Sequence, residues 1–181
     1  MRMRLTLTTV TAVGMVVLGI LTLAAPPHAR FSGSGADYAA DAVWAVLLAV
    51  GVPALVALGR GSGRAGRAAA AAAALGQAAL ALSVAATVAA GREVLDALFV
   101  AGFALELVGL VVLAAAARRA VVLALVPGLV IALALFGHGG TIALGAAWLA
   151  VGHRTTRAVR EQLPRRSGPR PGSADAAEGR C

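Results

Sequence analysis

Glu106 is the residue whose type and position most clearly suggest chemistry. It lies near the middle of a long apolar block, Ala97 to Ala117. A charged side chain at that depth in a membrane costs at least about 2.5 kcal/mol, so such residues usually face the interior of a helix bundle. Because desolvation disfavours the charged form, we expect the Glu106 carboxyl group to be largely protonated at neutral pH.

Helical spacing places small residues on the same face as Glu106. Gly102, Glu106 and Gly109 are spaced i, i+4 and i+7, which puts them on one side of a helix. The glycines would let another backbone approach closely, as small residues do where membrane helices pack. The opposite face carries large apolar residues suited to lipid, namely Val100, Leu107, Val108 and Val111.

The candidate partner of Glu106 is Gln77, in the preceding apolar block, Ala68 to Ala90. At about 1.5 Å per residue, Gln77 lies about 14 Å from the start of its block and Glu106 about 16 Å from the end of its own. On antiparallel helices the two side chains are therefore at similar depth. We predict that Gln77 and Glu106 form an intramembrane polar pair, by direct contact or through a shared water.

Two interpretations of this pair stay open. Glu106 could bind a proton or a cation, as intramembrane acids do in pumps and transporters. Alternatively, a neutral Glu106 bonded to Gln77 only pins two helices together. A single acid with no further polar partner is little for a transport path, so the structural interpretation is favoured.

Four further acids, Asp37, Asp41, Glu93 and Asp96, gather at the ends of apolar blocks. They could form an outer vestibule that gathers cations. The simpler interpretation is solvated loop charge, with acids favourably placed at two helix N-termini. Arg92 and Asp96 are also spaced i, i+4 and could pair, so the simpler interpretation is favoured.

Other chemistry finds no support in the sequence. The three histidines are isolated, so neither an H-E-x-x-H motif nor a clustered metal site is expected. The Gly-rich stretch from Gly59 to Arg67 lacks the Gly-Lys-Ser/Thr ending of a phosphate loop, and the chain contains no lysine. Cys181 is the one cysteine, so no intramolecular disulfide is possible. We expect no enzyme activity, no cofactor and no metal ion.

The elements that must position these residues are long apolar blocks. Of the 181 residues, 60% are hydrophobic and 13% charged, whereas about 25% are charged in an average soluble domain. This composition predicts an all-α polytopic membrane helix bundle of about six transmembrane helices. The predicted spans are residues 5–25, 38–58, 68–90, 97–117, 120–136 and 139–156, within a membrane domain of residues 1–160.

Three span boundaries need interpretation. The first block could be a signal peptide, but it is longer than the usual h-region of about 7–15 residues and two prolines follow it, which favours an uncleaved helix. Residues 120–152 are too many for one span, and the turn signal at residues 137–140 predicts a hairpin whose first helix is kinked at Pro127. Gly59 to Arg67 is expected to be a flexible loop, and residues 161–181 a disordered tail.

The arginines predict the orientation in the membrane. All sixteen basic residues are arginines, and arginine close to the membrane stays on the cytoplasmic side. With both chain ends in the cytoplasm, only Arg30 and Arg92 fall outside, and this pattern requires an even number of helices between Arg119 and Arg154. The inner arginines would favour anionic lipid headgroups at about 1 kcal/mol each. Nucleic acid is not expected, because the basic residues form short clusters rather than a stripe.

Composition also suggests a cellular setting. Heavy use of Ala, Gly, Arg and Val without lysine suggests a high-GC bacterial genome, and so a multi-pass protein of a bacterial inner membrane. The leading hypothesis is a structural or partner-binding membrane subunit. The alternative is a small proton- or cation-coupled transporter that uses Glu106.

Overall fold

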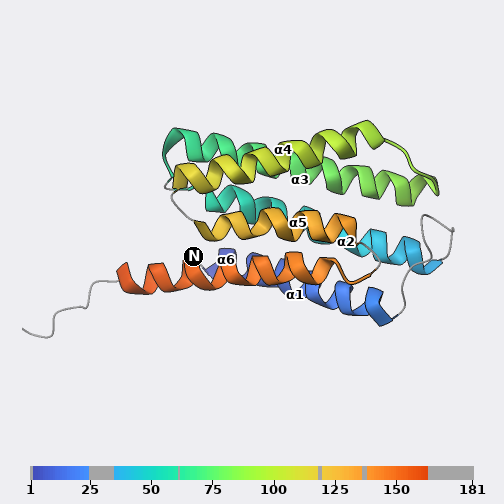
Figure 1. Cartoon of the computed structure of the whole chain (residues 1–181), viewed down its shortest axis with the longest axis horizontal. Helices are drawn as coiled ribbons and strands as arrows, with labels where there is room; N and C mark the ends of the chain where they lie inside the picture. The colour runs from blue at the N-terminus through green and yellow to red at the C-terminus, as the bar shows by residue number, and fades with distance from the viewer. Residues whose placement is uncertain (1, 25–34, 61, 118–119, 136–137, 163–181) are drawn as a thin grey trace, which may run out of the picture.

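The computed structural model describes residues 2–24, 35–60, 62–117, 120–135 and 138–162. Every regular element in this part of the chain is helical, which confirms the predicted all-α bundle (Figure 1). The elements are α1 (Arg2–Ala24), α2 (Gly35–Leu58), α3 (Gly63–Ala90), α4 (Asp96–Ala117), the 3-10 segment η1 (Ala120–Ala124), α5 (Leu125–Ala134) and α6 (Thr141–Gln162).

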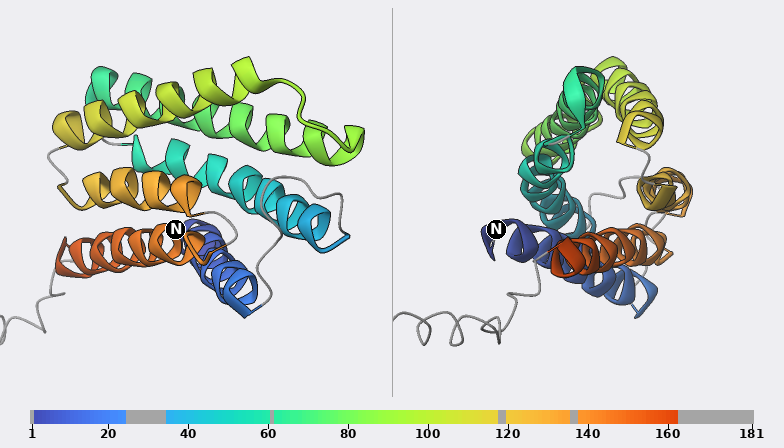
Figure 2. Two further views of the ribbon diagram at one scale, coloured as in Figure 1. Left: turned by 45° about the vertical axis from the view of Figure 1, so that its right-hand side comes forward. Right: turned by 90° about the vertical axis from the view of Figure 1, so that its left-hand side faces the viewer.

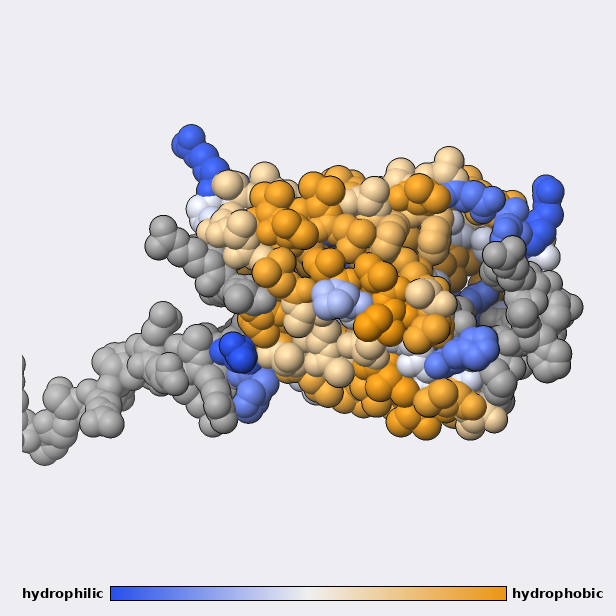
Figure 3. Space-filling view, in the orientation of Figure 1, coloured by the Kyte–Doolittle hydropathy of each residue, from blue (hydrophilic) through white to orange (hydrophobic). Residues whose placement is uncertain are grey.

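Four of these helices, α1 to α4, are long and apolar enough to cross a membrane. The apolar stretch of η1 and α5, Val121–Ala134, is shorter than a full span, and α6 carries its charged residues in its second half. On the face seen in Figure 3 the body of the molecule is mainly apolar, with hydrophilic residues towards its two ends. The chain is therefore a multi-pass membrane protein, and a total of six spans stays a prediction.

The helices pack in an order that follows the chain until α5. Helix α3 packs against both α2 and α4, while α1 lies between α2 and α6. Helix α5 packs on α6 and contacts α4 only slightly, so the bundle forms an open arc when viewed from its end (Figure 2). Helix α1 is closely held: a Cβ on Gly145 of α6 would lie 2.8 Å from the Ala12 oxygen. That α1 is an uncleaved helix stays a prediction.

Helix α3 begins earlier than predicted. The expected loop from Gly59 to Arg67 is wrong beyond Ser62, because α3 starts at Gly63. Glycine permits the tight turn into α3, since a Cβ on Gly59 would overlap the Cβ of Ala70. The helix has 28 residues, or about 42 Å, which exceeds the hydrocarbon thickness of about 30 Å. Its first turns therefore extend beyond that layer and carry the exposed Arg64 and Arg67.

The predicted hairpin is present, but Pro127 does not kink a helix. The residues before it form η1, and Pro127 is the third residue of α5. In the first turn of a helix the missing N–H of proline costs little, so Pro127 favours the start of α5. Helix α6 runs to Gln162, past the predicted end at 156. The rest of the predicted disordered tail lies outside the described residues.

Glycines bring the backbones of α3 and α4 together, as the sequence predicted. A Cβ on Gly102 would lie 2.9 Å from the Gly76 oxygen, and one on Gly109 would lie 2.5 Å from the Ala73 nitrogen. The opposite face of α4 is exposed at Val100, Val108 and Val111, whereas Leu107 is half-buried. Helix α4 therefore presents its small residues to α3 and its valines outward.

We expect Gly76→Ala to lower the free energy of unfolding in detergent by about 1–3 kcal/mol, because overpacking forces the backbones apart. An added Cβ at Gly76 would overlap the backbone nitrogen of Glu106. Gly152→Ala is the matched control, since its Cβ would come no closer than 3.2 Å to Thr8. Equal stability of the two variants in a thermal or denaturant titration would contradict the close α3–α4 contact.

Candidate functional site

The Glu106 side chain is enclosed by protein at the α3–α4 contact. It is 4% exposed, and its backbone packs directly on Gly76 of α3. In the described part of the chain its Oε2 atom has no hydrogen-bond partner. A buried polar atom without a partner is uncommon in proteins and calls for an explanation.

The Gln77 side chain binds α2 rather than α4. Its Nε2 donates a hydrogen bond of 2.7 Å to the carbonyl oxygen of Leu48. Gly51 makes this possible, because a Cβ there would overlap the Gln77 amide. Leu48 is followed by Ala49, whose carbonyl group lacks its usual helical donor because Pro53, four residues later, has no N–H. Gln77 therefore links α3 to α2 beside the point where proline interrupts the hydrogen bonds of α2.

Gln77 and Glu106 are thus buried in the same interior without a direct hydrogen bond between the described atoms. The Oε1 of Gln77 has no described partner, and its amide nitrogen is used by α2. The geometric reason is that α2 and α4 each pack closely on α3, while the backbones of α2 and α4 do not approach each other closely. The signal in the sequence was Gly51, which leaves space on α2 for the Gln77 amide. A water shared by Gln77 and Glu106 stays a prediction.

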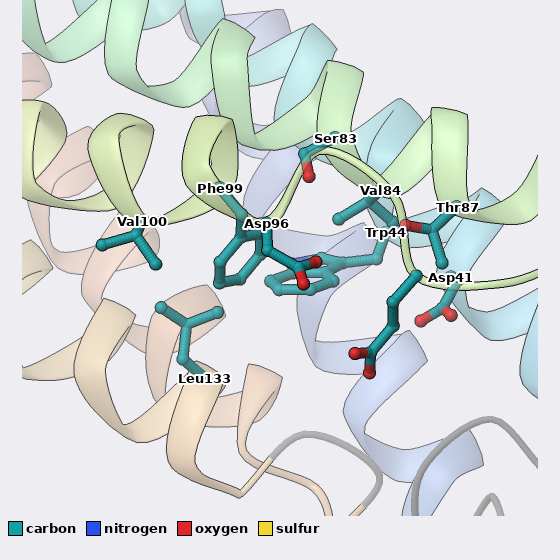
Figure 4. Close-up of a pocket in the computed structure, with 10 residues that line it drawn as sticks. Asp41, Trp44, Ser83, Val84, Thr87, Asp96, Phe99, Val100 and Leu133 are labelled. Carbon is teal, nitrogen blue, oxygen red and sulfur yellow. The ribbon is translucent and has the colours of Figure 1, made fainter.

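A second candidate site is a cavity of about 320 Å³ beside the α3–α4 connection. It lies among α2, α3, α4 and α5 and contains three of the four acids noted in the sequence, Asp41, Glu93 and Asp96 (Figure 4). The side chain of the fourth acid, Asp37, lies outside the described residues. The other lining residues are Trp44, Ser83, Val84, Thr87, Phe99, Val100 and Leu133.

The cavity has a buried interior and an acidic mouth. Asp41 and Trp44 of α2 are buried, as are Ser83 and Thr87 of α3. Glu93 and Asp96 are exposed and stand at the mouth. Sequence reasoning missed the two aromatic residues, although each follows an acid by three positions, as Asp41–Trp44 and Asp96–Phe99. Residues three apart share a helix face, and this spacing was the available signal.

Side-chain hydrogen bonds position the connection that carries the acids of the mouth. The Tyr38 hydroxyl donates to the Gly91 carbonyl at 3.0 Å, and the Ser83 hydroxyl donates to the Leu95 carbonyl at 3.3 Å. Gly91 ends α3 with a φ of 64° and Leu95 precedes α4 with a φ of 63°. A positive φ is unfavourable for leucine, so surrounding contacts must hold it. These two bonds fix both ends of the connection.

The expected pair of Arg92 with Asp96 is not formed in the described part of the chain. The i, i+4 rule applies within a helix, and α4 begins only at Asp96. The acids of the mouth are therefore not paired by this arginine. Among the described residues, no group of three or more His, Cys, Asp or Glu side chains is arranged to hold a metal ion.

Comparison of the chain with protein families, with curated protein sequences and with solved structures gives no match. Functional inference therefore depends on the chemistry of the two sites.

We expect Tyr38→Phe to increase hydrogen–deuterium exchange at the amides of residues 91–96. Loss of one hydrogen bond is worth about 0.5–1.5 kcal/mol, which corresponds to roughly a twofold to tenfold faster exchange. Thr22→Val is the control, since it removes a hydroxyl that bonds the Gly19 carbonyl within α1. Unchanged exchange at 91–96 in Tyr38→Phe would mean that the hydroxyl does not hold this connection.

Proposed function

We propose that the chain is a small proton- or cation-coupled permease of a bacterial inner membrane, with Glu106 as its intramembrane acid. The observation that carries this proposal is the buried Oε2 of Glu106, which has no described hydrogen-bond partner. A group that has to take up and release a proton or cation cannot be permanently satisfied by its neighbours. Intramembrane ionisable residues mark such pathways in pumps and transporters.

The hydrogen bond from Gln77 to α2 bears on the choice between the structural and the permease interpretation of Glu106. The structural interpretation required Gln77 to satisfy the glutamate. The Gln77 Nε2 instead donates to the Leu48 carbonyl, and no direct hydrogen bond joins the described atoms of Gln77 and Glu106, so the structural interpretation lacks the direct bond on which it was based. The permease interpretation needs no such partner.

A connection between the acidic cavity and Glu106 supports the proposal. On α4, Asp96, Phe99, Phe103 and Glu106 follow one another at i, i+3, i+7 and i+10, which places them along one side of the helix. Phe99 and Glu106 are about 10 Å apart along the axis. Cations gathered at the mouth would thus have a short way to the buried acid.

Bulky residues stand at the level between the two sites. Leu48 and Leu80 are fully buried, and Phe103 is half-buried against the core. An apolar layer between an outer cavity and a buried acid is what alternating access needs, because it prevents continuous leakage. In this proposal these residues must move for Glu106 to meet the cavity.

A second candidate, a structural or partner-binding membrane subunit, is favoured by the tight glycine contact. Glu106 lies where the α3 and α4 backbones are closest, with Gly76 against its nitrogen. Removing space there would disturb the helix pair whether or not the protein transports anything. This candidate predicts that shape at position 106 matters more than the carboxyl group.

We also propose that both chain ends are cytoplasmic. The described arginines at the end of the bundle carrying the α2–α3 turn are exposed, namely Arg60, Arg64, Arg67 and Arg154. Arg92 lies at the other end, in the α3–α4 connection. This asymmetry follows the positive-inside rule and would bring the arginine-rich face to anionic lipid headgroups.

The test is proton movement in vesicles containing the purified protein and a pH-sensitive dye. With sodium, potassium or choline outside, we expect a cation-dependent pH change in the unaltered chain and its loss in Glu106→Gln. Glu161→Gln is the matched control, because it removes an acid near the end of α6, at the opposite end from the cavity. Unaltered flux in Glu106→Gln would overturn the permease. The structural candidate would then predict a looser α3–α4 pair in Glu106→Leu.

A further inference from the structure

We infer that the cavity between α2, α3, α4 and α5 binds a small organic cation, such as an alkylammonium group. The inference deepens the proposed function by naming the class of substrate, and it rests on that function only for the transport of the bound cation. The binding step itself stands on the geometry of the cavity.

The size of the cavity fits a small molecule. Its volume of about 320 Å³ lies at the lower end of the range of about 300–1,000 Å³ found for ligand pockets. Such pockets are mostly apolar, with a few polar groups that fix the ligand. Val84, Val100 and Leu133 supply the apolar wall here, and Thr87 a hydroxyl.

Two aromatic rings make the cavity suited to a cation with an apolar surface. Trp44 of α2 and Phe99 of α4 both line it, and Figure 4 shows their rings next to each other with the Asp96 carboxyl group beside them. The faces of aromatic rings attract ammonium groups, and tryptophan does so best. The effect is larger where water is partly excluded, and Trp44 is 4% exposed.

The three acids define the charge of the ligand. Asp41 lies inside the cavity, and Glu93 and Asp96 are exposed at its mouth. Among the described residues that line the cavity, none is basic. The field of the exposed Glu93 and Asp96 carboxylates disfavours anions and raises the local concentration of cations at the mouth.

The arrangement of the acids favours an organic cation over a metal ion. A metal ion needs several ligand atoms converging on one point, and no three acids, histidines or cysteines in the described part of the chain are so arranged. The remaining wall is aromatic and aliphatic apart from the hydroxyl groups of Ser83 and Thr87, so it offers few ligand atoms to replace the hydration shell of a small inorganic ion. A quaternary alkylammonium group, which has no N–H to hydrate, is only weakly hydrated and needs no such replacement.

Calorimetric titration of the full chain in detergent micelles with choline tests the inference. The uncharged alcohol in which carbon replaces the choline nitrogen serves as the matched ligand. We expect choline to bind and the alcohol to bind at least about tenfold more weakly, because the shape is the same and only the charge is lost. Equal binding of both ligands, or no binding of choline, would overturn the inference.

Variants at the mouth provide the second measurement. The double variant Glu93→Gln with Asp96→Asn should weaken choline binding at least about tenfold, and both positions are exposed, which limits any effect on folding. Phe99→Leu should also weaken choline binding while leaving the alcohol unaffected. Glu161→Gln should change neither. Choline binding that is insensitive to the double variant would contradict a site at this cavity.

Glu106→Gln separates this inference from the proposed function. Its choline binding should equal that of the unaltered chain, since residue 106 does not line the cavity. Choline binding without any cation-dependent proton movement would refute the permease and leave the cavity site standing. The opposite outcome is a chain that does not bind choline but shows proton movement with sodium that depends on Glu106. That outcome would refute the cavity site and leave the permease standing.

Discussion

The free energy of placing a carboxyl group in hydrocarbon is the constraint on which the rest of this structure depends. Glu106 is tolerated at this depth only if protein surrounds it. The residues of α3 that face it are small, so the α3 backbone can lie directly against it. Gly76 lies against the Glu106 backbone, while Gly102 and Gly109 of α4 approach the α3 backbone. The alanine and glycine content of these helices is therefore what allows an acid to remain at mid-depth.

The same packing fixes the outer cavity. Because α3 and α4 pack closely along their lengths, the connection between them must turn within a few residues. It does so with positive φ angles at Gly91 and Leu95. Tyr38 and Ser83 hold this turn by its carbonyl groups. The turn carries Glu93 and presents Asp96 beside the aromatic rings. The α3–α4 hairpin thus positions both the acids of the mouth, Glu93 and Asp96, and the buried Glu106.

Sequence periodicity predicted the elements and the glycine contact well, because both depend on local spacing. It could not foresee which of two neighbouring helices a side chain would bind. Depth alone paired Gln77 with Glu106, yet the amide bonds the Leu48 carbonyl, since Gly51 leaves room for it on α2. The gathering of Asp41, Trp44 and Phe99 in one cavity was equally unpredictable, because it depends on how three helices and a turn are placed in space.

Oxygen accessibility along α4, measured by electron paramagnetic resonance, tests the enclosure of Glu106 most directly. Single cysteines would carry a nitroxide at successive positions from 100 to 111, with Cys181, the one native cysteine, replaced by serine. Oxygen concentrates in the lipid interior, so collision with it reports contact with lipid. The structure predicts maxima at the exposed positions 104, 108 and 111 and minima at the buried positions 106 and 110. A maximum at position 106, or the loss of helical periodicity, would show that Glu106 does not face α3.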